Sequence, residues 1–532
     1  METKKEINLD SVLESLGPYG RYNLLNFGLL LFPVLLSAFF ECGFIFEAEQ
    51  QNYRCLVPGC EEKINDTSWI QYAIPFEPKK DDFSQCKRYV PLNTSEFMCM
   101  RSDFSNTTIE CTEHVYEERH SFIKEFKLAC QEWKRTLVGT VHNSGMFAAM
   151  LLTGAISDRF GRKVAIGLSS ISSFIFGISR AFAPDYYSYL SLHFFEAALG
   201  GGLYSSAYVM VVELVGLKQR VFVSAMCNMT FVVGVVLLAV FAWFIDNWRN
   251  YIIVLYAPGI VAGVYVWFMN ESTRWLLSKG RRDEAIRILK KAAKINKLDP
   301  RSLDLDALGD PLLKKETLSM NRRSQLLKAI RSSIIWRRLI ICSFLWITCS
   351  LVYYGMSINA LTLGQNRYQN YMYVVLVEIP AYVVVVIVLD KYGRKRTLIT
   401  NYVICAVTSF MFAFLRKDTW YSIVLYLIGK WSVTLAYSSV YIYVSEVFPT
   451  NMRQTLISFC SMAGRIGSLL APQTPLLQNY LPSIHPTMIF GAMCVISSTL
   501  VLMLPETKNV RLPDTIEEAE ELSRVKNKTQ TT

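Results

Sequence analysis

Long apolar runs alternate with short polar links along the whole chain. Each run holds roughly 18 to 25 residues, which is enough for a helix to cross a hydrocarbon core about 30 Å thick. Twelve such runs predict twelve transmembrane helices. We place them at 23–45, 136–156, 164–182, 188–212, 221–244, 250–268, 338–360, 370–389, 397–415, 420–444, 454–477 and 486–504.

Composition agrees with a membrane protein. Of the 532 residues, 52% are hydrophobic and 19% are charged, and the mean hydropathy is +0.25. This is too apolar for an ordinary soluble protein. The first twenty residues are polar and no small-residue cleavage site follows the first run, so we expect the first helix to be a retained signal anchor.

The distribution of charge predicts the orientation of the helices. The net charge is +11, and residues 270–338 alone hold 18 Lys and Arg against 8 Asp and Glu. The positive-inside rule places this segment in the cytoplasm, together with the basic links 158–163 and 390–396 and both termini. The excess of positive charge therefore indicates membrane topology rather than nucleic-acid binding.

The segment 46–135 is then predicted to lie outside the cell. It contains three N-glycosylation sequons, which begin at Asn65, Asn93 and Asn106. It also contains six cysteines in an oxidising compartment, which predicts about three disulfides with fifteen possible connectivities. These cysteines are Cys55, Cys60, Cys86, Cys99, Cys111 and Cys130.

Short motifs repeat at an almost constant offset. The link "SDRFGRK" at 157–163 returns as "LDKYGRKR" at 389–396, and two further motifs return in the same order. Such self-similarity is the mark of an internally repeated architecture. The matched acids are Asp158 with Asp390, Glu213 with Glu446 and Glu271 with Glu506, which are 232, 233 and 235 residues apart.

The repeat predicts two homologous halves of six helices each, at 23–268 and 338–504. A cytoplasmic linker at 269–337 joins them, and cytoplasmic tails occupy 1–22 and 505–532. Halves of this kind are typical of transporters that rock around a site near the membrane midplane.

The repeated charged links predict a conformational latch. Their charged side chains can pair with helix ends and glutamates of the neighbouring half, and so hold one orientation of the halves. The alternative is that these charges only fix the topology. The candidate latch residues are Asp158, Arg159, Arg162, Glu213, Asp390, Arg394, Glu446 and Arg453.

Several longer stretches resemble a known family. They include "DSVLESLGPYGRYN" before the first helix, "FKLACQEWK" at the end of the first loop, "NESTRWLLSKGR" after the sixth helix and "YVSEVFPTNMR" after the tenth. Over almost its whole length the chain resembles a major facilitator superfamily member of the organic cation/anion/carnitine transporter family. The resemblance implies an all-α major facilitator fold and movement of small organic ions across the plasma membrane.

Ionisable residues inside the predicted helices are candidates for substrate binding, because each costs roughly 2.5 kcal/mol or more unless it faces a cavity or a partner. The candidates are Glu41, His193, Glu196, Glu378, Lys430 and Arg465.

Arg465 and Glu378 are the most informative of these. In the resembled family, dedicated cation transporters carry Asp at the position of Arg465, whereas anion and carnitine transporters carry Arg, and residues 429–472 look most like the carnitine branch. A guanidinium can hold a carboxylate through two hydrogen bonds but would repel a simple cation. This favours a substrate with a carboxylate or a zwitterion, unless Glu378 or another acid neutralises Arg465.

Aromatic residues supply the other half of such a site. A quaternary ammonium is attracted to aromatic faces by about 0.5–2 kcal/mol for each contact. The alternative for any one of these residues is packing or contact with lipid. By resemblance, the central cavity is lined by Trp346, Tyr353, Tyr204, Tyr208 and Phe231, and Asn228 adds a polar contact.

The fourth helix departs from the family pattern. Where the family usually has Arg followed three residues later by Gln, this chain has His193 and Glu196. A histidine that is exposed to the cavity would titrate near neutral pH, which predicts that transport responds to protons.

Together these observations predict a plasma-membrane transporter for small organic cations and zwitterions of the carnitine or betaine type, which works by alternating access. The sequence contains no nucleotide loop, metal-ligand spacing or nucleophile–base motif, so an enzyme is not expected. No cofactor is predicted, although Na⁺ or H⁺ could act as a coupling ion. The alternatives are an organic-anion exchanger and, in another class, a receptor or scaffold that does not transport; the sequence leaves the oligomeric state open.

Overall fold

The computed structural model describes residues 9–17, 20–61, 68–77, 82–92, 98–117, 120–216, 219–299, 332–364, 366–415, 419–449, 452–480 and 485–508. The predicted glycosylation sites Asn65 and Asn93, part of the predicted linker and most of the predicted C-terminal tail lie outside these residues.

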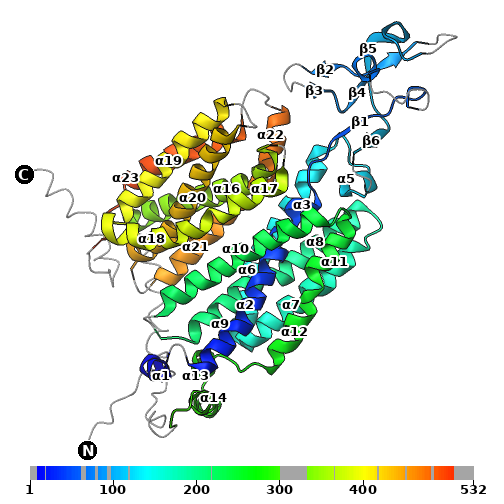
Figure 1. Cartoon of the computed structure of the whole chain (residues 1–532). Coiled ribbons are helices and arrows are strands. Elements are labelled where there is room, and N and C mark those ends of the chain that lie inside the picture. The colour runs from blue at the N-terminus through cyan, green and yellow to red at the C-terminus, as the bar shows by residue number, and fades with distance from the viewer. Residues whose placement is uncertain are drawn as a thin grey trace, which may run out of the picture.

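The N-terminal half is the bundle coloured blue to green in Figure 1. Its six predicted segments are each formed by one helix or by consecutive helices. These are α2 (Arg21–Cys42) with α3 (Phe44–Glu47), α6 (Glu132–Phe160), α7 (Arg162–Ala181), α8 (Tyr186–Gly200) with α9 (Leu203–Glu213), α10 (Arg220–Phe244), and α11 (Trp248–Tyr256) with α12 (Pro258–Tyr265) and the 3₁₀ turn η3 (Val266–Phe268).

The C-terminal half is the neighbouring bundle, coloured yellow to orange. It repeats the arrangement with α16 (Ser333–Asn359) and η6 (Ala360–Thr362), α17 (Arg367–Leu376) with α18 (Glu378–Tyr392), α19 (Arg394–Phe414), α20 (Trp420–Val447), α21 (Arg453–Leu470) with η7 (Ala471–Gln473) and α22 (Thr474–Tyr480), and α23 (Pro486–Leu502).

The predicted all-α membrane fold is confirmed. Among the described residues, eight helical stretches are long and apolar enough to cross a membrane, and α23 is apolar but shorter. The other three predicted segments lie on α6, on α8 with α9, and on α21 with α22. Several of their polar residues are buried by protein, as His142 and Asn143 of α6 are.

The predicted fourth segment is broken into α8 and α9 by three glycines. A Cβ atom at Gly201 would lie 2.3 Å from Sδ of Met146, and one at Gly202 would lie 1.9 Å from Oγ1 of Thr153. Both neighbours belong to α6, so the break allows this helix to approach closely.

A small disulfide-linked domain, called here the loop domain, stands at one end of the N-terminal half (Figure 1). It contains three antiparallel strand pairs: β1 (Tyr53–Cys55) with β6 (His114–Tyr116), β2 (Phe76–Glu77) with β3 (Asp82–Phe83), and β4 (Lys87–Pro91) with β5 (Phe104–Glu110). Short helical turns accompany them, namely α4 (Ile70–Ala73), η1 (Arg101–Asp103) and α5 (Phe122–Glu125).

The prediction of three disulfides in this domain is confirmed. The bridges join Cys55 to Cys111, Cys60 to Cys99, and Cys86 to Cys130. Three of these cysteines, Cys55, Cys60 and Cys99, pack with Trp69 in a small core, as expected for a domain too small to form a large one. Asn106 is exposed on β5.

Three helices outside the bundles pack against the opposite end of the N-terminal half: α1 (Leu9–Ser15), α13 (Thr273–Ser278) and α14 (Arg282–Ile295). Asp10 of α1 pairs with Arg274 of α13 and with Arg220 at the start of α10. We call this side of the molecule the linker end, and the side of the loop domain the loop-domain end.

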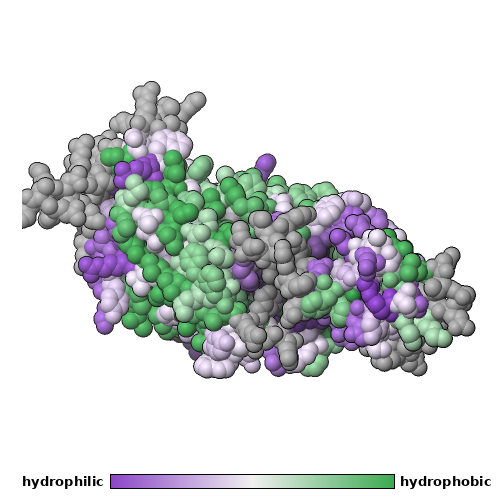
Figure 2. Space-filling model, turned by 90° about the horizontal axis from the view of Figure 1, so that it is seen from above, coloured by the Kyte–Doolittle hydropathy of each residue, from purple (hydrophilic) through white to green (hydrophobic). Residues whose placement is uncertain are grey.

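The outer surface of the bundles is apolar. Figure 2 shows a wide hydrophobic area over one side of the molecule, whereas hydrophilic side chains are more frequent toward the opposite side. The exposed apolar side chains include Val383, Val386 and Ile387 on α18 and Val407 and Met411 on α19. A surface of this kind is suited to contact with lipid.

Candidate functional site

Glu378 lies at the start of α18, inside the C-terminal half. Its carboxylate is 3.0 Å from Nζ of Lys430 on α20 and accepts a hydrogen bond of 2.8 Å from the hydroxyl of Tyr353 on α16. The ammonium of Lys430 also donates to Oγ of Ser357 at 2.7 Å and lies 3.5 Å from the centre of the Tyr353 ring. Glu378 and Lys430 are both buried, so the charge of Glu378 is already compensated inside the protein.

Aromatic rings from two helices gather beside this pair. The ring centre of Trp346 lies 4.2 Å from the ring centre of Tyr441 and 5.8 Å from that of Tyr437. Tyr437 in turn stacks on Tyr353 at 5.6 Å, and Tyr353 contacts Tyr354 edge-on at 5.2 Å. The indole N–H of Trp346 has no hydrogen-bond partner among the described residues.

Arg465 of α21 reaches from the C-terminal half to the N-terminal half. Its Nε lies 3.1 Å from Sδ of Met150 on α6. The guanidinium is also close enough to Tyr354, Tyr437 and Glu41 to interact electrostatically, although it forms no direct ion pair with Glu41 among the described residues. Glu41 lies on α2. A carboxyl group and a guanidinium therefore face the same region from opposite halves.

The predicted residues of the N-terminal half form a second group. Tyr204 donates a hydrogen bond of 2.7 Å to Oδ1 of Asn228, stacks on Tyr208 at 5.9 Å and contacts Phe231 edge-on at 5.4 Å. Tyr204 is also close enough to Glu41 and to Tyr441 of the other half to interact electrostatically. The predicted aromatic and polar residues therefore come together in two groups that face each other between the halves.

The two halves are in contact at the loop-domain end. Glu49 pairs with Arg367 at 2.9 Å, and Gln473 bonds with Thr136 at 3.1 Å and Thr140 at 2.7 Å. A cavity of about 550 Å³ lies beside these contacts and is lined by Phe44, Glu49, Thr136, Gly139, Arg367 and Pro472, among others. These contacts join the halves on this side.

At the linker end, Arg162 begins α7 after Gly161, whose φ is +108°. Its guanidinium bonds to Asp158 at 2.9 Å and to Glu213 at 3.3 Å. The carboxylate of Glu271 accepts the backbone N–H of Arg162 at 3.2 Å, at the positive end of the α7 dipole.

The C-terminal half repeats this arrangement. Arg394 begins α19 after Gly393, whose φ is +89°, and its guanidinium lies 3.1 Å from Glu446. Glu506 accepts the backbone N–H of Arg394 at 3.0 Å. The matched motifs of the sequence therefore form matched clusters in space.

The sequence led us to expect that these residues pair across the two halves, but the ion pairs of the structure differ from that expectation. Each ion pair of Arg162 and Arg394 stays within its own half, because the glutamate at the end of α9 or α20 lies beside the start of α7 or α19 in the same bundle. Arg159 and Asp390 are exposed, and Arg453 is half-buried at the start of α21.

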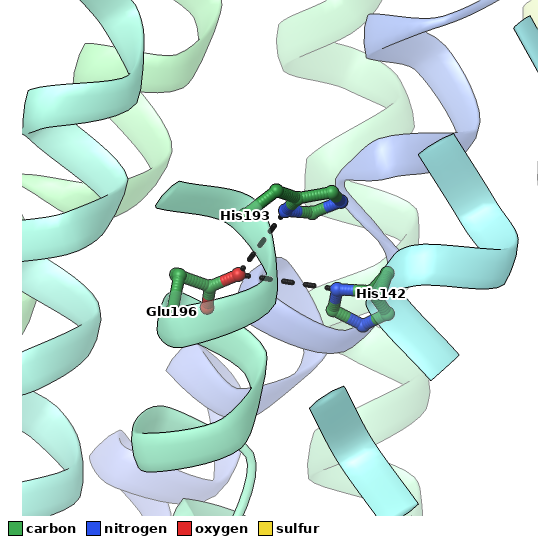
Figure 3. A group of neighbouring side chains, drawn as sticks. All are labelled: His142, His193 and Glu196. Atoms are coloured by element: carbon green, nitrogen blue, oxygen red, sulfur yellow. Dashed lines mark ion pairs between the residues drawn. The ribbon is translucent and has the colours of Figure 1, made fainter. Parts of the chain in front are cut away.

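A further polar cluster, which the sequence indicated only in part, lies inside the N-terminal half. His193 and Glu196 of α8 lie with His142 of α6 in Figure 3, and all three are buried. Arg180 and Glu47 adjoin them and form an ion pair of 2.9 Å. His193 is thus enclosed by protein, which differs from the cavity exposure considered for it above.

Arg180 and Glu47 were missed because each stands at the edge of an apolar run. Glu47 lies two residues beyond the predicted run 23–45 but still within α3, and Arg180 lies two residues before the end of the predicted run 164–182. Both side chains are buried inside the bundle. A search for charged residues within one helical turn of the end of each apolar run would have identified both residues.

Comparisons with known proteins agree with this architecture. The model of the Major Facilitator Superfamily matches residues 133–472. The xylose transporter XylE from E. coli, in a partially occluded inward open conformation, superposes with a TM-score of 0.60 at 15% identity, over 91% of this chain and 98% of that chain. XylE bound to 6-bromo-6-deoxy-D-glucose gives a TM-score of 0.58 at 17% identity, over 94% and 99%. The fold is therefore that of a multi-pass membrane transporter, and not of an enzyme.

Relatives of known sequence define the family more closely. The organic cation transporter protein of Drosophila melanogaster is 32% identical over 526 residues, which cover 96% of this chain and 94% of that protein. Solute carrier family 22 member 1 of Bos taurus is 32% identical over 542 residues, which cover 97% and 94%. The chain belongs to the solute carrier 22 family of the Major Facilitator Superfamily. These matches do not single out the carnitine branch.

Proposed function

We propose that this protein carries small organic cations and zwitterions across the plasma membrane by alternating access. Relatives at about a third identity bear the name of organic cation transporters, which supports the cationic substrate class. The positive linker end would face the cytoplasm, and the disulfide-bonded loop domain would face the outside.

One observation supports a zwitterion in particular. Glu41 and Arg465 face the region between the halves from opposite sides and interact electrostatically without direct contact. A molecule with an ammonium at one end and a carboxylate at the other could lie between them, with its ammonium toward Glu41 and Tyr204 and its carboxylate on the guanidinium.

The contacts of Glu378 support a different role from the part in substrate binding expected for it. Because Lys430 compensates its charge, Glu378 contributes no free negative charge for a bound cation. We assign the attraction of the ammonium to Glu41 and the aromatic rings, and we assign to Glu378 the positioning of Tyr353.

The contacts at the loop-domain end support an inward-facing state. With that end closed, a substrate would reach Glu41 and Arg465 from the linker end. The matched clusters around Arg162 and Arg394 would keep each half rigid while the two halves rock.

The test is uptake by cells that express the chain at their surface. The probes are radiolabelled tetraethylammonium as a pure cation, carnitine as a zwitterion and p-aminohippurate as an anion, each with and without sodium. Loss of a hydrogen-bonded charge pair costs about 1.5–3 kcal/mol, so Arg465→Asp should lower carnitine uptake by about tenfold or more and retain or increase uptake of the cation. Glu41→Gln should lower uptake of both.

Equal losses of carnitine and cation uptake in Arg465→Asp would contradict the zwitterion scheme. Uptake of the anion alone by the unmodified protein would identify an organic-anion exchanger instead. Absence of all three activities, with normal surface expression, would favour a receptor or scaffold.

A further inference from the structure

The buried cluster of the N-terminal half contains more ionisable groups than its fold requires. Glu47 Oε1 pairs with Arg180 at 2.9 Å, and Glu47 Oε2 accepts a hydrogen bond of 2.6 Å from the hydroxyl of Tyr189. This pair balances its own charges. The proposed transport path makes no use of the three side chains beside it, His142, His193 and Glu196.

Glu196 forms no direct ion pair with a lysine or arginine among the described residues, although Arg180 lies within electrostatic reach. Its ion-pair partners among the described residues are two imidazoles, with Nδ1 of His193 at 3.5 Å and Nδ1 of His142 at 3.9 Å (Figure 3). An isolated buried carboxylate is costly by several kcal/mol. Each neutral imidazole already carries one N–H. For the net charge of Glu196, His142 and His193 to be zero, the three side chains must therefore hold one additional proton, either on the carboxyl or on an imidazole.

The guanidinium of Arg180 limits which atoms can carry that proton. Nη1 of Arg180 is hydrogen-bonded to Nδ1 of His193. A guanidinium only donates, so Nδ1 of His193 accepts and carries no proton of its own. The exchangeable proton is then shared between Glu196 and His142, and neither ring nitrogen of His142 is hydrogen-bonded to another side chain among the described residues.

The same contact argues against a metal ion. Carboxylate and imidazole groups also occur as metal ligands, and the three side chains lie close together. Here, however, the Nδ1 atom of His193 that faces Glu196 is occupied by an N–H donor, and the fixed charge of Arg180 adjoins the site.

His142 lies between the cavity at the loop-domain end and the candidate substrate region. Its ring is 4.9 Å from that of Phe44, which lines the cavity together with Gly139, one turn before His142 on α6. On its other side, His142 lies against the backbone of Glu41 and within electrostatic reach of Arg465. A change of charge at His142 would therefore be felt at the candidate substrate site.

We propose that His142 and Glu196 form a binding site for one proton, filled from the cavity at the loop-domain end when the Phe44 side chain moves, and coupled to transport. The coupling rests on the transport function proposed above, whereas the proton site does not. The other titratable or charged groups that lie around the pair are Glu41 of α2, Glu47 of α3, Arg180 of α7, His193 of α8, Tyr256 of α11 and Arg465 of α21.

Two measurements test the proposal, with Glu196→Gln and His142→Gln as variants. The first is the melting temperature of the purified full-length protein between pH 5.5 and 8. We expect the melting temperature of the unmodified protein to change across this range and the dependence to shrink in Glu196→Gln, because an amide does not titrate. The second is uptake of carnitine and tetraethylammonium at the same external pH values, where we expect a change of about threefold or more that falls below about 1.5-fold in the variant.

Glu284→Gln is the matched control, because Glu284 is a half-buried acid of α14 at the linker end, paired only with Arg281 among the salt bridges of the described residues. His142→Gln gives a second reading of the same site if Glu196→Gln does not fold. Equal pH profiles in the unmodified protein and in the folded variants, by both measurements, would overturn the proposal.

The remaining outcomes separate the two proposals. If no substrate is taken up but the pH dependence of the melting temperature still disappears in Glu196→Gln, the proton site stands and the coupling and the transport function fail. A rise in melting temperature with micromolar Zn²⁺ that His142→Gln abolishes would identify a metal site and overturn the proton site.

Discussion

The two halves of the molecule are alike at the linker end and unlike at their centres. At the linker end, Arg162 and Arg394 both follow a glycine with positive φ and bind a glutamate at the end of a neighbouring helix. At the centres, the C-terminal half holds one ion pair, Glu378 with Lys430, whereas the N-terminal half adds Glu196 and two imidazoles to its own pair.

This difference separates architecture from specificity. Both halves need the same tight turn between two helices, and the same cluster meets that need twice. The centres contain different ionisable side chains, which differ in number and in ability to titrate. Variants that treat the two halves in parallel can test this division.

The largest effect is expected at the buried pairs. Removing one partner of such a pair costs about 3–5 kcal/mol, because the remaining charge stays buried. Arg180→Met and Lys430→Met should therefore both reduce the yield of folded protein, measured by size-exclusion chromatography, and lower the melting temperature.

Neutralising the second partner as well, in Arg180→Met with Glu47→Gln or Lys430→Met with Glu378→Gln, should restore part of the loss. A Lys430→Met protein that is as stable as the unmodified one would show that the C-terminal pair is not a structural equivalent of the N-terminal pair.

A moderate and equal effect is expected at the two linker-end clusters. Arg162→Gln and Arg394→Gln each remove a partly exposed ion pair, worth about 1 kcal/mol or less. Both should lower the maximal uptake rate and leave KM within about twofold, since neither residue lies near Glu41 or Arg465.

Arg159→Gln is the control for this pair of variants, because Arg159 is adjacent and exposed. A large effect of one arginine and none of the other would show that the matched geometry hides unequal roles.

A smaller effect is expected where the halves meet. Glu49→Gln breaks the ion pair with Arg367 that joins them at the loop-domain end. A loss of about 0.5–1 kcal/mol should speed amide hydrogen exchange around Thr136 and Gln473 by about two- to fivefold. Glu132→Gln is the control, because Glu132 pairs with Arg135 on the same helix. Unchanged exchange in Glu49→Gln would mean that this pair does not hold the loop-domain end closed.

The smallest effect is expected at Asp10. The hydrogen bond from Arg274, and the positive charges of Arg274 and Arg220, hold the pKa of Asp10 below its ordinary value. An acid with a lowered pKa stabilises the fold above its unfolded pKa, and this contribution is lost as the pH falls through the folded pKa. Asp10→Asn should therefore lower the free energy of unfolding at pH 7 by less than about 1 kcal/mol, which is seen as a slightly lower melting temperature. At pH 3 the same substitution should change the melting temperature less. An effect of the same size at both pH values would contradict the electrostatic cause.

The sequence predicted what depends on periodicity. Hydropathy located the helices, and the repeats at 158 and 390 identified equivalent turns, because these are local properties of the chain. It could not predict with which half Arg162 pairs, since a basic residue beside two helix ends can turn toward either. The same limit applies to Glu378, whose partner Lys430 lies on another helix.

Other features of the candidate site required the three-dimensional structure. The six cysteines of the loop domain fit many connectivities, and only the fold shows which sulfurs meet. Glu41 appeared in the sequence as one intramembrane acid among several, and the role proposed for it depends on the pairing of Glu378 with Lys430, which only the structure shows. In this packing a side chain at Gly201 would collide with Met146, which the sequence alone could not predict.

The state of the thiols offers a practical route to watching the halves move. Six of the thirteen cysteines are bridged in the loop domain, and the other seven are all buried. A single cysteine introduced at the surface would therefore be the one readily labelled by a fluorophore or spin probe. Distances between the bundles can then be followed in a protein that keeps all its native cysteines.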